Sequence, residues 1–272
     1  MINIILKPIL ILIVTTMLTM PQVWAVRPFI TDDATLIGRK RIEFANWAYV
    51  YPKDKWGWEL WHSVNIGATD WFEINVLMCW GQGLEIDAAN KIVKKWSYTL
   101  PLLQAKFLIR DYEPNRWPGV TIAVGSDLPW GKGPYVARGY GAFAFVSATQ
   151  CIGKEENVLI HTQVGGAWET YMENNERKHK GGFVLGLGTQ VKIYKGFHGI
   201  AEIVRGDPYS QNVGPMFQVG IRQFISDKLQ VDCAFGSGIG KNSANYMITA
   251  GIRYVFSFNK DSNFAPNGRK IN

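Results

Sequence analysis

Residues 246–258, the last regular stretch of the chain, alternate two kinds of side chain. Every second residue is apolar or aromatic, and those between are mostly small or polar. Because successive side chains of a strand point to opposite faces, this stretch predicts a strand with one apolar and one polar face. A strand of a soluble β-sandwich shows the same alternation, so the pattern alone leaves two fold classes open.

The order of residues within this stretch resembles the signal by which outer-membrane barrels are passed to the barrel assembly machinery. That signal has a polar residue, a glycine and two aromatic residues near the end of the chain. Here the matching residues are Thr249, Gly251, Tyr254 and Phe256. The chain departs from the usual pattern because residues 259–272 follow as a tail, which we expect to be periplasmic. We expect the four residues to form an assembly signal, with the assembly machinery as a partner.

Twelve segments show strand-like alternation bounded by turn residues. They are residues 41–51, 57–68, 71–80, 96–110, 117–129, 139–152, 157–170, 181–194, 197–206, 214–225, 229–240 and 245–258. Charged residues recur on the polar faces, where a watery lumen accepts them; the solvent face of a sandwich is the alternative. We therefore expect an all-β fold, a transmembrane antiparallel up-and-down β-barrel of about 12 strands, over residues 41–258.

The connections between these segments alternate between short and long. The expected long connections are residues 81–95, 130–138, 171–180 and 207–213. Bacterial outer-membrane barrels have short periplasmic turns, longer external loops and an even number of strands. Aromatic residues gather where the apolar bands end, which indicates girdles at the two membrane interfaces. They are Trp71, Trp80, Trp96, Trp117, Trp130, Trp168, Tyr194 and Tyr209.

Alternation also predicts which charged side chains line the lumen. The acids are Glu43, Glu59, Glu73, Asp127, Glu202 and Asp232, and the bases are Lys106, Arg110, Lys192, Arg222 and Arg253. The two signs nearly balance, so the interior is close to neutral. Two roles stay open: mutual pairing that holds the wall together, and guidance of a polar solute.

The start of the chain predicts export. Lys7 precedes an apolar run, and Val23 and Ala25 stand at the −3 and −1 positions of a cleavage site, so residues 1–25 read as a signal peptide. An uncleaved anchor helix is the alternative. Residues 26–40 follow as a periplasmic or plug segment, with a proline and two adjacent acids that favour a turn.

Composition argues against other classes of function. The formal net charge of +7 is not gathered into a long basic run, so we expect no nucleic-acid partner. The three cysteines are widely spaced and have no histidine at metal-ligand spacing. We therefore expect neither a disulfide framework nor a metal or organic cofactor.

The residues after the predicted cleavage site resemble the opening of a bacterial outer-membrane barrel family. That family carries the labels "transporter" and "putative MetA pathway of phenol degradation". The resembling stretches are residues 27–34 (Arg-Pro-Phe-x-Thr-Asp-Asp-Ala), 42–44, 66–73 and 249–254. The resemblance spans nearly the whole mature chain and implies an outer-membrane barrel for uptake of small, aromatic compounds. It supplies no catalytic or ligand residues.

Catalytic patterns give little support for an enzyme. A barrel phospholipase needs His and Ser on one strand face, whereas His62 and Ser63 are adjacent and would lie on opposite faces. Glu173, Glu176 and His179 imitate the acidic rim of a barrel protease, but a solvated loop of mixed charge explains them equally. The glycine-rich residues 186–188 and 236–240 lack the strand and helix that flank a phosphate loop.

The expected role is passive passage of small molecules through a barrel in the bacterial outer membrane. The expected surroundings are outer-membrane lipids and lipopolysaccharide. Two alternatives remain: a plugged structural or surface-interaction barrel, and an outer-membrane hydrolase.

Overall fold

A computed structural model describes most of the chain between residues 29 and 258. The described ranges are 29–51, 57–86, 92–133, 136, 139–153, 157–173, 176–207, 214–239 and 246–258. The predicted signal peptide and the tail after residue 258 lie outside them, as do Tyr209 and most of the expected connection at 207–213.

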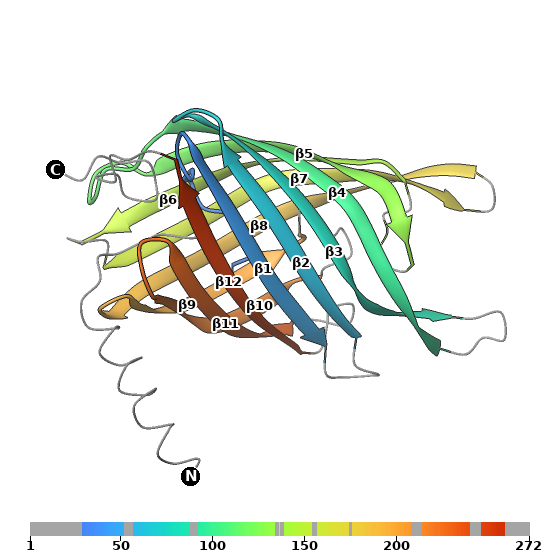
Figure 1. The fold of residues 1–272 in the computed structure, drawn as a ribbon. Coiled ribbons are helices and arrows are strands. Elements are labelled where there is room, and N and C mark those ends of the chain that lie inside the picture. The colour runs from blue at the N-terminus through green and yellow to red at the C-terminus, as the bar shows by residue number, and fades with distance from the viewer. Residues whose placement is uncertain are drawn as a thin grey trace, which may run out of the picture.

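Twelve antiparallel strands form one closed barrel, in which each strand pairs with its neighbours in sequence and β1 pairs with β12 (Figure 1). The strands are β1 (Arg41–Tyr51), β2 (Gly57–Gly67), β3 (Phe72–Ile86), β4 (Ile92–Arg110), β5 (Gly119–Lys132), β6 (Gly141–Ile152), β7 (Val158–Glu173), β8 (Glu176–Tyr194), β9 (Phe197–Arg205), β10 (Met216–Phe224), β11 (Leu229–Gly238) and β12 (Met247–Ser257). The predicted fold class and strand number are confirmed. Closure leaves no unpaired edge around the ring.

The described parts of two expected loops are strands. β3 and β4 stay paired out to Ile86 and Ile92, and β7 and β8 out to Glu173 and Glu176. The loop assignment at 81–95 and 171–180 was wrong because charged residues do not end a strand here. Outside the barrel wall both faces of a two-stranded ribbon meet water, so charges do not interrupt its backbone pairing. Both hairpins project from the same end of the barrel (Figure 1).

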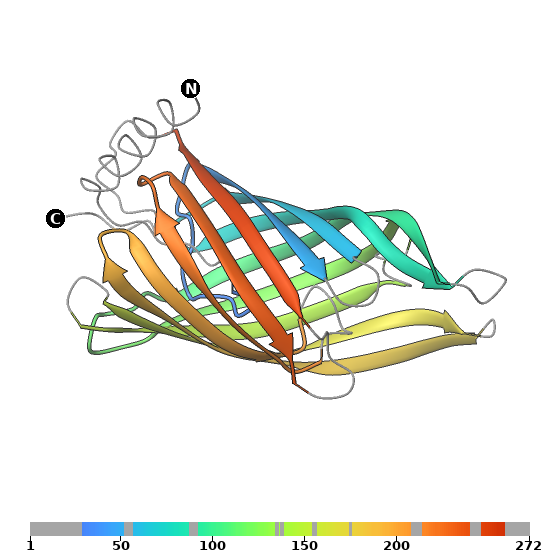
Figure 2. The same ribbon diagram turned by 90° about the horizontal axis from the view of Figure 1, so that it is seen from below.

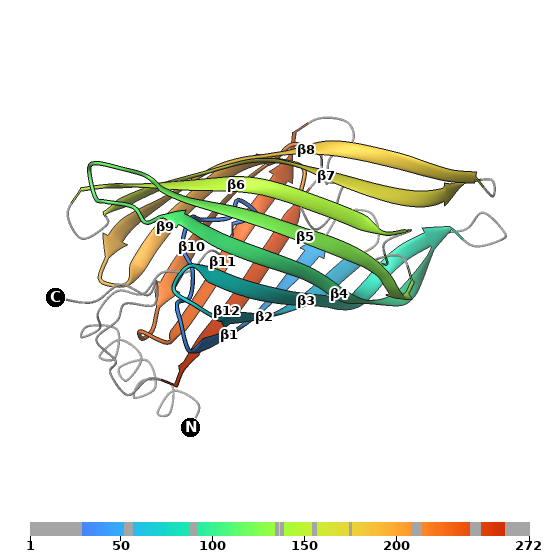
Figure 3. The ribbon, with the colours of Figure 1, turned by 90° about the horizontal axis from the view of Figure 1, so that it is seen from above.

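The barrel has two different ends, which we name by their connections. The turn end carries the short connections between paired strands such as β8 and β9, and β1 begins and β12 ends there (Figures 1 and 2). The loop end carries the two projecting hairpins (Figure 3). Short turns on one side and long connections on the other are the arrangement of bacterial outer-membrane barrels.

The outer wall is apolar and exposed. Side chains such as Phe217, Val219 and Ile221 alternate along β10 with buried inward ones. The expected girdle residues Trp71, Trp80, Trp96, Trp117, Trp130, Trp168 and Tyr194 are all exposed. This surface is suited to lipid. Among the described residues, no helix is long and apolar enough to cross a membrane.

One polar group on the outer wall is satisfied internally. The indole Nε1 of Trp80 donates to His62 Nε2 at 2.6 Å, and His62 Nδ1 lies 2.5 Å from Asn46 Oδ1. A neutral histidine protonated on Nδ1 satisfies both contacts. A hydrogen-bonded chain of this kind removes the cost of placing polar atoms against lipid.

Candidate functional site

The lumen contains part of the chain itself. Residues 29–40, which we call the N-terminal segment, run inside the barrel before β1 begins (Figures 2 and 3). Phe29, Thr31 and Ala34 are at most 2% exposed. The segment forms no strand of the barrel, so its contacts are made one residue at a time.

The far end of the segment is held through its backbone. The amides of Ile30 and Thr31 donate to the two carboxylate oxygens of Glu202 on β9, at 2.7 and 2.9 Å. The amide of Asp32 donates to Gln163 Oε1 on β7 at 2.6 Å. Charge-assisted bonds to a carboxylate are stronger than neutral ones, so Glu202 is the main anchor of this end.

The nearer part of the segment is held in the same way by other strands. The amide of Ala34 donates to Thr149 Oγ1 on β6, and that of Ile37 to Glu73 Oε2 on β3, both at 2.8 Å. Thr121 on β5 donates to the carbonyl of Asp33 at 3.4 Å. From Ile37 back to Ile30, these backbone amides thus meet β3, β6, β7 and β9 in turn.

A buried ion pair joins the segment to β4. Lys106 Nζ lies 2.8 Å from Asp32 Oδ1 and 3.5 Å from Asp33 Oδ1. Asp33 also accepts from the amide and hydroxyl of Thr35, at 3.0 and 2.8 Å. Removing one partner of such a pair would leave a buried charge uncompensated, which makes these contacts specific as well as cohesive.

The first described residue, Phe29, lies among charged, aromatic and small residues of the wall. The Arg222 guanidinium stands 5.4 Å from its ring centroid, and the ring of His161 lies 5.3 Å away. Opposite it, glycines let the segment approach β8. A Cβ at Gly186 would stand 2.4 Å from Thr31 Oγ1, and one at Gly188 would stand 3.1 Å from Phe29.

The structure brings most of the predicted lumen residues together inside the barrel. The buried ones are Glu43, Glu73, Lys106, Glu202, Arg222, Asp232 and Arg253. Glu59, Asp127 and Lys192 are partly exposed, nearer the strand ends. Some of these groups pair within the wall: Arg253 with Glu43, and Arg222 with Gln190. The expected mutual pairing therefore exists beside a second use, binding of the N-terminal segment.

Arg110 is a correction. It was expected in the lumen by parity, but it is exposed at the turn end, where it lies 5.4 Å from the Trp117 ring and donates to the Pro118 carbonyl. An irregularity in the β4–β5 register between Leu108 and Arg110 changes the alternation. Beyond a bulge, parity counted from earlier residues assigns the wrong face.

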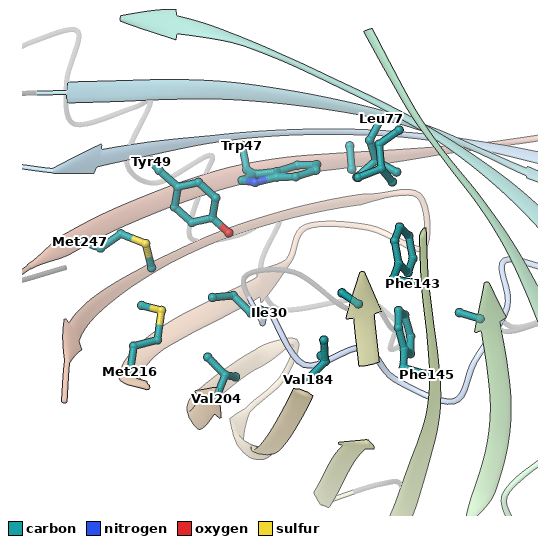
Figure 4. Close-up of a cluster of buried hydrophobic side chains, with 14 residues drawn as sticks. Ile30, Trp47, Tyr49, Leu77, Phe143, Phe145, Val184, Val204, Met216 and Met247 are labelled. Carbon is teal, nitrogen blue, oxygen red and sulfur yellow. The ribbon is translucent and has the colours of Figure 1, made fainter. Parts of the chain in front are cut away.

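Sequence reasoning missed a second region of the lumen, toward the loop end. Thirteen buried apolar side chains of the wall, with Ile30 of the segment, form one cluster that we call the apolar band (Figure 4). Its wall members are Ala45, Trp47, Tyr49, Leu77, Leu102, Ala123, Phe143, Phe145, Ala167, Val184, Val204, Met216 and Met247.

Aromatic rings make up much of the surface of this band. Trp47 stacks on Trp61 with centroids 5.9 Å apart, and Phe143 lies parallel to Phe145 at 6.0 Å. In Figure 4 the labelled side chains other than Ile30, which belongs to the segment, point inward from the surrounding strands. A signal for them exists in the sequence, because Trp47 and Tyr49 share the parity of Glu43 on β1.

The catalytic patterns are not assembled. His62 faces outward, whereas Ser63 is buried inside and donates to Asn65 at 3.1 Å. Glu173 and Glu176 are partners in the β7–β8 strand register, and His179 stacks on Trp168.

The four residues of the expected assembly signal all lie on β12, on both of its faces. Thr249 is buried inside, and Tyr254 and Phe256 are exposed outside, 4.5 Å apart in an edge-to-face contact. Gly251 pairs with Trp47 across the β1–β12 seam. Their role in assembly stays a prediction.

No family model matches the chain, and no curated protein matches it. Its fold is similar to solved outer-membrane barrels. The COG4313 outer membrane channel from Pseudomonas putida F1 is 11% identical with a TM-score of 0.59, covering 79% of this chain and 95% of that one.

Two porins are also similar. The NanC porin is 6% identical, with a TM-score of 0.52 and coverage of 78% and 98% of the two chains. The KdgM porin, solved with a disordered oligogalacturonate, is 8% identical, with a TM-score of 0.52 and coverage of 79% and 99%. Identities this low show a shared outer-membrane barrel fold. The predicted phenol-degradation family stays a prediction.

Proposed function

We propose that this chain is an outer-membrane channel for passive passage of small molecules, closed by its N-terminal segment. The observation that carries the proposal is how the segment is held. Each bond from residues 30–37 to the barrel described above ends on a wall side chain. The segment can therefore leave the lumen without breaking the strand ladder that keeps the barrel closed.

The apolar band supports small hydrophobic or aromatic solutes. A solute of this class would contact Trp47, Tyr49 and Phe143 at the loop end before it reached the charged region and the segment. Ligand sites are lined mostly by hydrophobic and aromatic side chains with a few polar groups. The family resemblance implied the same class of solute, from unrelated residues.

A plugged structural barrel is the second candidate, and the burial of the segment favours it. The Lys106 ion pair and the amide bonds to Glu202 are enclosed and specific. If they never open, the barrel conducts nothing. The two candidates therefore differ in one property, the ability of the segment to move.

A reversible tether tests this property. A Cβ at Gly186 would stand 3.1 Å from Thr31 Cβ, slightly below the separation of about 3.5–4.5 Å in a disulfide, so a small shift of the segment allows the bond. The variant carries Thr31→Cys and Gly186→Cys, with Cys79, Cys151 and Cys233 replaced by serine. In planar bilayers we expect little current when it is oxidised and a clear increase after reduction. The controls are the serine-substituted chain without the new cysteines and the same chain with Gly186→Cys alone, whose current should not respond to reduction.

The outcomes separate the candidates. If the reduced protein and the control both stay silent, and removal of residues 26–40 also yields no current or solute entry into liposomes, passage is wrong and the structural barrel stands. If the oxidised protein conducts as well as the reduced one, the passage exists but the segment does not close it.

The outer membrane is the proposed location, where lipid and lipopolysaccharide would surround the apolar outer wall. Tyr254→Asp with Phe256→Asp would place two charges on that wall, each costing less than the about 2–4 kcal/mol that an Arg or Lys costs at mid-bilayer, and less again near an interface. We expect insertion to fail, as measured by outer-membrane level and heat-modifiable gel mobility. Normal values of both would contradict an assembly role for these residues.

A further inference from the structure

Two inward-facing residues of opposite charge stand directly across from each other on the barrel wall. Glu73 on β3 is paired in register with Lys106 on β4, and the side chains are 4% and 2% exposed. Directly opposed residues of antiparallel strands have Cβ atoms about 4.5–5.5 Å apart, so side chains of this length can form an ion pair.

In the closed structure the segment engages both of them. Glu73 Oε2 accepts the amide of Ile37 at 2.8 Å, and Lys106 Nζ binds Asp32 at 2.8 Å and Asp33 at 3.5 Å. Both opposed wall residues thus contact the segment in the closed structure. When it leaves, each of them loses a contact, but each keeps a neighbour of opposite charge.

Glu202 is held in the same way by the segment but has different neighbours. It accepts two segment amides, and the residues across from it are Gly188 on β8 and Gln218 on β10. Gln218 already donates to it in the closed structure. Neither opposed residue carries a charge, so departure of the segment leaves this buried carboxylate without a directly opposed cation.

We propose that Glu73 and Lys106 form a reserve ion pair, which closes when the N-terminal segment leaves the lumen. Glu73 then stabilises the open state, while Glu202 stabilises the closed state. This inference rests on the proposed function, because it describes how the same passage is regulated. On opening, Glu73 and Lys106 exchange their contacts with the segment for a contact with each other. Glu202 loses its contacts with the segment and gains no opposed cation.

The two carboxylates therefore respond in opposite directions to the same substitution. Glu73→Gln keeps an oxygen for the Ile37 amide but removes the charge that would take up Lys106. It also leaves Lys106 wholly to Asp32 and Asp33, so the closed state is favoured. Glu202→Gln keeps one oxygen for two amides and loses the charge, so the open state is favoured.

The experiment compares these variants by two measurements. The first is the open fraction in planar bilayers. The second is the labelling rate of Thr31→Cys, in the serine-substituted background, by a bulky water-soluble maleimide. Thr31 is 1% exposed in the closed structure, so labelling reports departure of the segment whether or not current flows. We expect a decrease of roughly fivefold for Glu73→Gln and an increase of similar size or more for Glu202→Gln.

Glu43→Gln is the matched control. Glu43 is a buried wall carboxylate that pairs with Arg253, a bond in which the segment takes no part. It should shift both measurements much less than Glu73→Gln does. Asp32→Asn with Asp33→Asn removes only closed-state contacts of Lys106 and should increase both.

Changes in the same direction for Glu73→Gln and Glu202→Gln, or no labelling of Thr31→Cys in any variant, would overturn the reserve pair. Opposite changes in labelling without current in any variant would support the pair and overturn passage. The two conclusions are thereby tested separately.

Discussion

The two regions of the lumen differ in the chemistry of their wall and in what its side chains contact. Toward the turn end, the wall is polar and the space between its side chains is filled by the N-terminal segment. Toward the loop end, large apolar side chains of the wall, such as Trp47 and Phe143, belong to one cluster that lines the lumen. Strand β6 contributes to both, with Phe143 and Phe145 in the apolar band and Ser147 and Thr149 beneath the segment.

This difference shows that facing the lumen does not decide the chemistry of a residue. Along one inward face, polarity follows what each residue meets. Thr149 meets a peptide amide, and Phe145 meets other apolar side chains. The polar wall groups can form hydrogen bonds either with the segment or, after it leaves, with water. The apolar band can form favourable contacts only with other apolar groups.

The largest effect should come from breaking the apolar band. Trp47→Ala removes a ring that is 3% exposed and stacked on Trp61, and we expect the free energy of unfolding to fall by about 3–5 kcal/mol. Urea unfolding in detergent measures this change. Trp130→Ala, which removes a ring that is 55% exposed, should cost far less. Equal losses would mean that the band is not packed as the structure has it.

An intermediate effect should come from a substitution where the N-terminal segment packs against β8. Gly186→Val places a Cβ 2.4 Å from Thr31 Oγ1, so overpacking of about 1–3 kcal/mol acts against the closed state. We expect more current in planar bilayers. On the same strand, a Cβ at Gly182 meets nothing within 4 Å, so Gly182→Ala should leave the current unchanged. Unchanged current in Gly186→Val would show that the segment adapts without leaving.

The smallest effect should be on ion selectivity. Arg222→Ala with Arg253→Ala removes two buried positive charges and keeps the four buried wall acids Glu43, Glu73, Glu202 and Asp232. The reversal potential in a salt gradient should shift toward cations, modestly because salt screens charges across a wet lumen. Heat-modifiable mobility controls for folding. A shift toward anions would mean that these arginines do not face the permeating path.

The barrel was predictable because its pattern is local. Residues 41–51 were expected as a strand and are β1, since alternation with period two marks both faces. The projecting hairpins could not be predicted in this way, because strands outside lipid need no apolar face and so show no alternation. The apolar band was missed since apolar side chains were assigned to lipid as a class, although the parity of Glu43 places Trp47 inside.

The contacts of the N-terminal segment with the wall could not be predicted from the sequence, for a different reason. Residues 29–40 have no periodicity, and each contact depends on a residue far along the chain. The Asp32 amide meets Gln163, which is 131 positions away. The sequence left open whether these residues entered the lumen, and only the closed ring of strands brings the partners to one height.

The bond between Ile30 and Glu202 also constrains the order of events in folding, because it joins residues 172 positions apart. Contacts between distant parts of a chain form slowly, since a long loop must close first. The contacts of the N-terminal segment require β3 to β9 to be in place. The ring itself is completed when β1 pairs with β12. We therefore expect occlusion of the lumen to come late in folding, once strands as distant in the sequence as β3 and β9 have been brought around one lumen.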